Sequence, residues 1–113
     1  MRDVDQFPEF LRALPEVNVP LAGANGWTIQ GANHQVVLLE FTQNVEVPEH
    51  AHAEQWELPI AGRAVLHMHG VSREYQQGES FFIPAGVPHA ATVHAGYKAI
   101  LIFNERDRYE PQG

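Results

Sequence analysis

The sequence predicts an all-β domain, built as a sandwich or a barrel, and three observations support this. Short apolar segments recur from residue 27 onward at the intervals typical of sandwich and barrel strands. Clusters of turn residues, at 31–33, 70–72 and 95–96, separate these segments. The nine Gly and eight Pro disfavour a long helical bundle. The expected strands are residues 27–30, 35–42, 54–61, 63–69, 73–76, 80–84, 89–94 and 97–103.

The N-terminal segment has the spacing of a helix instead. Phe7, Phe10, Leu11 and Leu14 lie at positions i, i+3, i+4 and i+7, which places them on one helical face. Pro15 ends this pattern. We therefore expect a short helix that packs as a cap on the β structure.

The length of 113 residues predicts a single domain, residues 1–113, with a hydrophobic content of 44% that suffices for one core. Residues 1–20 are expected to form a helical or extended cap, and residues 27–104 the β-barrel. The final sequence RDRYEPQG is polar and predicts a solvated tail.

The composition excludes several classes of partner. A net charge of −7 disfavours nucleic acid and anionic membranes, because both are polyanions that require a basic surface. With no cysteine, the chain has no disulfide, thiolate nucleophile or zinc finger. It contains no apolar run of the length of a signal peptide or a membrane span, so we expect a cytoplasmic protein.

Two strands are apolar on both faces, which predicts a partner subunit. Residues 36–39 and 99–103 are unbroken apolar runs, whereas a strand with one solvated face alternates. In the expected strand 54–61, Trp56, Leu58 and Ile60 share the face opposite Gln55. One short helix cannot shield several strands, so a homodimer is the expected cover.

Three histidines have the spacing of a metal site. His50 and His52 are two residues apart, so in a strand both imidazoles point to one side. Gln55 or Glu57 can add an oxygen ligand, and His89 follows a turn shaped by Pro and Gly. Such a set suits a divalent transition metal: Zn, Ni, Mn, Fe or Cu.

Three further histidines are not expected to bind metal. His67 and His69 form a second HxH pair beside a glycine turn, without a third partner. His94 lies five residues after His89 and therefore on the opposite face of its strand.

The two histidine segments together resemble the two conserved motifs of the cupin family. The resemblance extends over nearly the whole chain and implies a double-stranded β-helix, the cupin jelly-roll barrel, with a metal near its mouth. Val93 stands where the second motif usually closes with Asn. The first motif corresponds to His50, His52, Gln55 and Gly62, and the second to Gly78, Pro84, Gly86 and His89.

The fourth metal ligand is left open between two residues. Gln55 keeps the usual six-residue spacing to Gly62, but only two residues separate it from His52. Glu57 keeps the usual spacing from His52 but lies too close to Gly62. Because the turn glycine sets the strand register, Gln55 is favoured as the ligand. Glu57 then points into the same cavity and is the candidate acid/base group.

The resemblance implies two possible functions. The first is a metal-dependent enzyme acting on a polar, oxygen-rich small molecule, such as a sugar or sugar acid. A set of three histidines and a glutamine resembles that of the cupin that linearises unsaturated uronates, which favours isomerase or lyase chemistry; dioxygenase activity is a variant. The alternative is a non-catalytic module that binds a small molecule or stores metal.

Overall fold

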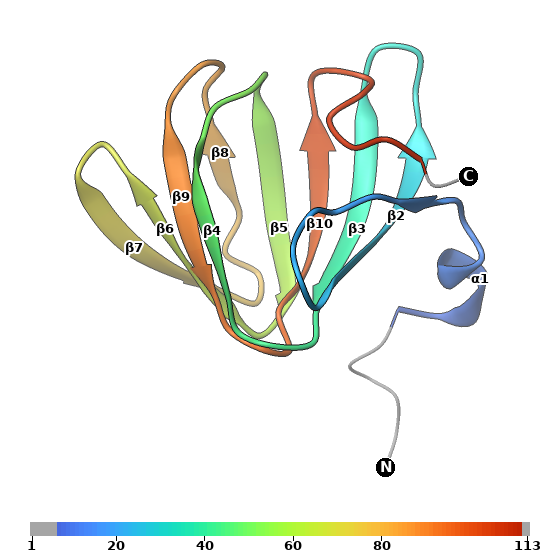
Figure 1. Ribbon diagram of the computed structural model, residues 1–113, viewed down its shortest axis with the longest axis horizontal. Coiled ribbons are helices and arrows are strands. Elements are labelled where there is room, and N and C mark those ends of the chain that lie inside the picture. The colour runs from blue at the N-terminus through green and yellow to red at the C-terminus, as the bar shows by residue number, and fades with distance from the viewer. Residues whose placement is uncertain (1–6, 112–113) are drawn as a thin grey trace.

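The computed structural model describes residues 7–111 as two antiparallel sheets that form a barrel-like jelly roll (Figure 1). The larger sheet has the strand order β1-β2-β3-β10-β5-β8, and the smaller has the order β4-β9-β6-β7. The larger sheet contains β1 (Glu16–Val17), β2 (Ala24–Gln30), β3 (Gln35–Phe41), β10 (Lys98–Phe103), β5 (Gln55–Ala61) and β8 (Phe81–Ile83). The smaller contains β4 (Val45–His50), β9 (His89–Val93), β6 (Arg63–Met68) and β7 (Val71–Gln76).

The all-β prediction and the expected strands are confirmed, with three main differences. The two-residue strand β1 was not among the expected strands. β2 begins at Ala24, before the predicted residue 27. β4 was not among the expected strands, because its sequence VEVPEH is polar and contains Pro48. Pro48 is tolerated because β4 lies at the edge of its sheet, where a backbone N–H is not needed for pairing.

The N-terminal helix is shorter than its spacing suggests. It is α1 (Glu9–Arg12), and Phe10 is 74% exposed, so the prediction that Phe10 lies on the packed face was wrong. Phe7 lies before the helix and packs edge-on against Trp27, with ring centroids 6.0 Å apart. Leu11 joins this small cluster on the outer side of β2. No helix in residues 7–111 is long and apolar enough to cross a membrane.

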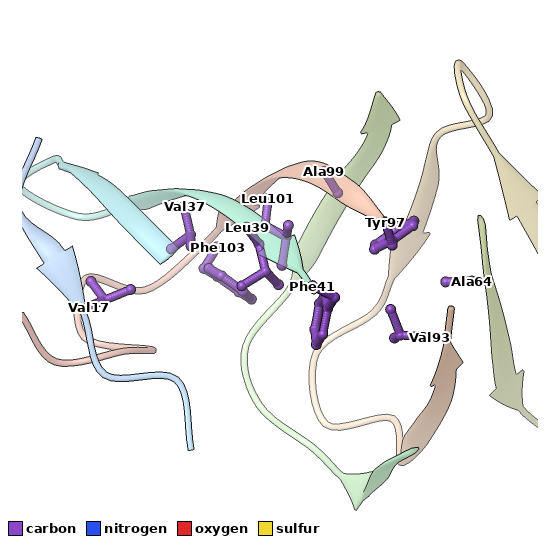
Figure 2. Close-up of a cluster of buried hydrophobic side chains, with 10 residues drawn as sticks. All are labelled: Val17, Val37, Leu39, Phe41, Ala64, Val93, Tyr97, Ala99, Leu101 and Phe103. Atoms are coloured by element: carbon purple, nitrogen blue, oxygen red, sulfur yellow. The ribbon is translucent and has the colours of Figure 1, made fainter. Parts of the chain in front are cut away.

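The main core lies between the two sheets. Alternate residues of β3 and β10 point inward, and Tyr97 and Phe103 are almost fully buried. Figure 2 shows this cluster, with side chains from β3 and β10 facing Val93 and Ala64 of the smaller sheet. The cluster comprises Val17, Val37, Leu39, Phe41, Ala64, Val93, Tyr97, Ala99, Leu101 and Phe103.

A row of apolar side chains crosses the outer face of the larger sheet. Pairing aligns one residue from each of five strands, and four of the five are substantially exposed. The neighbouring outward positions are covered by the cluster around Phe7, whereas this row is not. We call it the outer row, and it consists of Phe82, Trp56, Ile102, Val36 and Ile29.

In the C-terminal segment Arg108 and Tyr109 are half-buried, whereas Arg106, Asp107, Glu110 and Pro111 are exposed, so the predicted solvated tail is confirmed only in part within residues 7–111. Tyr109 accepts a hydrogen bond at its carbonyl from the Gln35 side chain (2.7 Å) and donates its N–H to the same side chain (3.0 Å). The Asn18 N–H donates to the Glu110 carbonyl. These contacts bring the segment beside the histidine-bearing end of the barrel, where it helps to shape the site.

Candidate metal centre

The fold gathers three histidines at one end of the barrel. His50 is the last residue of β4, and it pairs across the sheet with His89, the first residue of β9. His52 follows two residues later, beyond the end of β4, so the prediction that both residues of the pair lie within one strand was wrong. The three rings nevertheless converge, with centroids 4.3 to 5.1 Å apart.

The potential ligand atoms of these three residues all lie within 4.8 Å of one another, close enough to hold one metal ion. Within residues 7–111, no carboxylate, that of Glu57 included, belongs to this group. The structure thus brings together His50, His52 and His89 as the sequence predicted.

Hydrogen bonds fix the orientation of each ring. The Nδ1 atom of His50 lies 2.8 Å from the Pro48 carbonyl oxygen, and that of His89 lies 2.9 Å from the Val87 carbonyl. His52 makes the same contact with the carbonyl of the next residue, at 2.8 Å. A carbonyl only accepts, so each Nδ1 carries the proton and each Nε2 keeps its lone pair.

Two of these Nε2 atoms are buried without a partner. His52 Nε2 and His89 Nε2 have no hydrogen bond to any described residue. Burial lowers the pKa of His52 to about 4, and it also lowers the pKa of His89. Both rings are therefore neutral at pH 7, as a metal ligand must be. These two nitrogen atoms are buried, each with a lone pair that receives no hydrogen bond from the described residues. A bound divalent metal would use both lone pairs, and this supports a metal site.

Gln55 and Glu57 extend the site into the barrel. Both point inward from β5 and are buried, which confirms that they share one strand face. Gln55 Nε2 donates to Glu57 Oε1 at 2.6 Å, which leaves Gln55 Oε1 free of donors from residues 7–111. Gln55, Glu57, His50 and His89 line the same cavity.

Tyr97 is a member of this site that sequence reasoning missed. Its hydroxyl donates a short hydrogen bond to Glu57 Oε2, so both carboxylate oxygens are occupied. Burial raises the pKa of Glu57 to about 7, although the hydrogen bonds from Tyr97 and Gln55 oppose this shift. Burial and the neighbouring carboxylate raise the pKa of Tyr97. Glu57 can therefore take up or release a proton near neutral pH.

The family follows from comparison with known proteins. The model of the cupin domain matches residues 37–103, which is more than half of the chain. The chain belongs to the cupin family. Among functionally curated proteins, none matches this cupin significantly.

Solved structures support the same fold. An RmlC-like cupin from Shewanella frigidimarina superposes with a TM-score of 0.75 and 23% identity, over 91% of this chain and 93% of that one. KdgF from Halomonas sp. has a TM-score of 0.69 and 18% identity, with coverage of 80% and 87%. Oxalate decarboxylase from Bacillus subtilis has a TM-score of 0.71 and 16% identity, over 85% of this chain but 28% of that chain. At these identities the likeness concerns the fold of this cupin.

The remaining histidines of this cupin lie away from the three ring nitrogens. His67 is on β6 and uses both ring nitrogens, toward Ser72 Oγ (2.7 Å) and Thr92 Oγ1 (2.9 Å). His94 follows the end of β9 and lines a separate cleft with Arg63. His67 and His94 thus lie outside the three-histidine group.

Proposed function

We propose that this cupin binds one divalent transition metal through His50, His52 and His89 and acts on a polar small molecule of the sugar or sugar-acid class. The observation that carries the proposal is the set of Nδ1–carbonyl hydrogen bonds, which leaves Nε2 of each ring as the acceptor. A ring held in this way loses little freedom when its Nε2 binds a metal.

Gln55 is the proposed fourth ligand, in preference to Glu57. The amide nitrogen of Gln55 is engaged by Glu57, which leaves its carbonyl oxygen available. Both oxygens of Glu57 are already occupied, by Gln55 and Tyr97. A neutral amide would leave the full charge of the metal in place.

The same geometry supports a role for Glu57 in proton transfer. The bound metal would supply Lewis-acid polarisation of a ligand carbonyl or hydroxyl oxygen. Glu57 holds or releases a proton at its carboxylate, and its pKa of about 7 suits both roles. Tyr97 and Gln55 hold the carboxylate in place from its two sides. Isomerase or lyase chemistry on a sugar acid fits this set of groups.

The first experiment is elemental analysis of protein purified without chelator or metal-affinity resin. We expect about one transition metal ion per wild-type chain and a loss of that metal in His50→Ala. His94→Ala removes a histidine from another cleft and is the matched control. A wild-type protein that contains no metal and cannot be loaded with Zn, Ni, Mn, Fe or Cu contradicts the proposal.

The alternative function is a non-catalytic binding module, and Glu57→Gln distinguishes the two. The glutamine amide can still form hydrogen bonds with both Gln55 and Tyr97, but it has no titratable proton. An enzyme would lose conversion of an unsaturated uronate, followed by NMR, while its metal content stays at the wild-type level. If no sugar acid is converted by wild type but ligands still bind, the binding module is supported.

We also propose that a second copy of the chain covers the outer row. The cluster around Phe7 covers neighbouring outward positions, whereas Trp56 and Phe82 are left 38% and 50% exposed. A two-fold dimer interface uses the same patch on both subunits, so the outer row of one copy can cover that of the other. The proposed partners are thus a small-molecule ligand and a homodimer subunit.

A further inference from the structure

Arg108 is a partly buried cation without an acidic partner. Its guanidinium carbon lies 4.5 Å from the ring centroid of Tyr109 and 5.9 Å from that of Phe103. Its Nε atom is buried and has no hydrogen-bond acceptor within residues 7–111. Arg108 forms none of the ion pairs within residues 7–111. A buried N–H without an acceptor is unfavourable, and an anion bound at this position would supply the missing acceptor.

This cation lies beside the three histidines. The Phe103 ring that Arg108 contacts also packs edge-on against His52, with ring centroids 5.6 Å apart. Arg108 and His52 thus contact the same aromatic ring, which places the guanidinium beside the histidine site.

A groove contains residues of both features. It is lined by the end of β4, residues 47–50, by Pro20 and Leu21, and by Arg108 and Tyr109. Because His50 also lines the interior cavity, the groove adjoins the three-histidine site. Glu49 is the acidic residue in its wall, and it makes no ion pair with Arg108 among the described residues.

We propose that Arg108 binds a carboxylate group of the ligand, whose other oxygen atoms reach the three-histidine site. The planar guanidinium matches the two oxygens of a carboxylate, and the aromatic rings beneath it hold it in place. With a single cation and Glu49 nearby, the groove suits a carboxylate monoanion better than a phosphate dianion. This inference rests on the proposed function and deepens it, because it narrows the proposed ligand to a molecule that carries a carboxylate group.

The experiment follows the Nε–H resonance of Arg108 by ¹⁵N NMR in metal-loaded and metal-free full-length protein. The probes are acetate, oxalate and glucuronate, with glucose as the neutral control and inorganic phosphate as the competing anion. We expect at least one of the three carboxylates to shift this resonance, and we expect glucose to leave it unchanged. Arg106, which is exposed and paired with Asp107, serves as the internal reference. No shift with any carboxylate, a larger shift with phosphate, or an equal shift at Arg106 overturns the proposal.

Variants then measure the contribution of Arg108. Arg108→Gln should weaken the best carboxylate by roughly 10- to 100-fold, as expected for loss of a charged hydrogen bond. Arg106→Gln removes the same charge nearby and should leave affinity within about twofold. Thermal unfolding shows whether each variant is folded. Arg108→Lys is the second variant, because it retains the positive charge but loses the planar guanidinium that can donate two parallel hydrogen bonds. Unchanged affinity in both Arg108 variants overturns the proposal.

Metal analysis of the same samples separates this inference from the proposed function. If Arg108→Gln keeps its metal and loses carboxylate binding, both stand. If wild type holds no metal but a carboxylate still shifts Arg108, the metal proposal fails and the carboxylate site stands. If metal binds and no carboxylate does, the carboxylate site fails alone.

Discussion

The two HxH pairs of this chain differ in what their hydrogen bonds leave free. His50 and His52 each donate from Nδ1 to a backbone carbonyl, so Nε2 remains an acceptor. His67, on the outer face of β6, has partners at both nitrogens. Thr92 donates its hydroxyl proton to Glu46, so it can only accept from His67 Nε2, and Nδ1 then accepts from a serine hydroxyl.

This difference shows that the motif by itself does not make a ligand. In the first pair, carbonyls of the chain bind the ring protons, and burial removes water from the opposite nitrogen of His52. On the outer face, neighbouring hydroxyls satisfy both nitrogens of His67, and the residue acts as a cross-strand link between β7 and β9. The availability of one nitrogen decides which pair can bind metal.

The largest expected effect is on metal-dependent stability. A metal present at about 1,000 times its dissociation constant stabilises the folded state by about 4 kcal/mol. We expect wild type and His67→Ala to gain this stability, and His89→Ala to gain none, because it lacks one of the three nitrogens. Denaturant unfolding with added Zn²⁺ or with EDTA measures the gain. Equal gains in His67→Ala and His89→Ala would mean that the metal binds elsewhere.

The next effect concerns the pH dependence of the metal-free protein. Burial raises the pKa of Glu57 from 4.5 to about 7 in the folded protein. As the pH rises, the unfolded chain therefore loses this proton at a lower pH than the folded protein does. Stability from Glu57 is complete below pH 4.5 and is lost as pH rises to about 7, by roughly 3 kcal/mol in total. Glu57→Gln removes this loss.

Denaturant unfolding in EDTA from pH 4.5 to 8 tests the Glu57 prediction through the difference between wild type and variant. Burial lowers the pKa of His52 to about 4, which acts in the opposite direction by reducing stability as pH falls below 6.5. Wild type and Glu57→Gln share this contribution of His52, so the difference between their free energies of unfolding reports on Glu57 alone. A difference that does not change between pH 4.5 and 8 contradicts the expected titration.

A third effect sharpens the contrast between the inner and outer faces of β5. Gln55 and Glu57 point inward, whereas Trp56 between them is in the outer row. Trp56→Ala should weaken the proposed dimer by about 2 kcal/mol, near 30-fold in dissociation constant, because buried aromatics dominate such interfaces. Analytical ultracentrifugation measures this, and Phe10→Ala, which removes an exposed aromatic outside the row, is the control. Wild-type protein that is monomeric at high concentration contradicts the dimer.

The sequence was sufficient for those features that depend on local spacing. Gln55 and Glu57 alternate with apolar residues, so their shared face could be predicted before the fold was known. β4 escaped detection because its alternation is short, with Val45 and Val47 on either side of Glu46, and Pro48 interrupts it. Tyr97 and Arg108 were missed for a different reason. Their positions depend on contacts between distant segments, such as the pairing of Gln35 with Tyr109, which no local pattern encodes.

The smallest expected effect is the loss of His67 itself. His67→Ala should destabilise the protein by about 1 kcal/mol, because water can replace the lost partners of Ser72 and Thr92 on this solvated face. Its metal content and carboxylate affinity should equal those of wild type. Denaturant unfolding with EDTA measures the change, and Thr92→Val tests whether the network is lost as a unit. A loss of more than about 3 kcal/mol would indicate that His67 is essential to the smaller sheet, and that its hydrogen bonds contribute as much as a buried network.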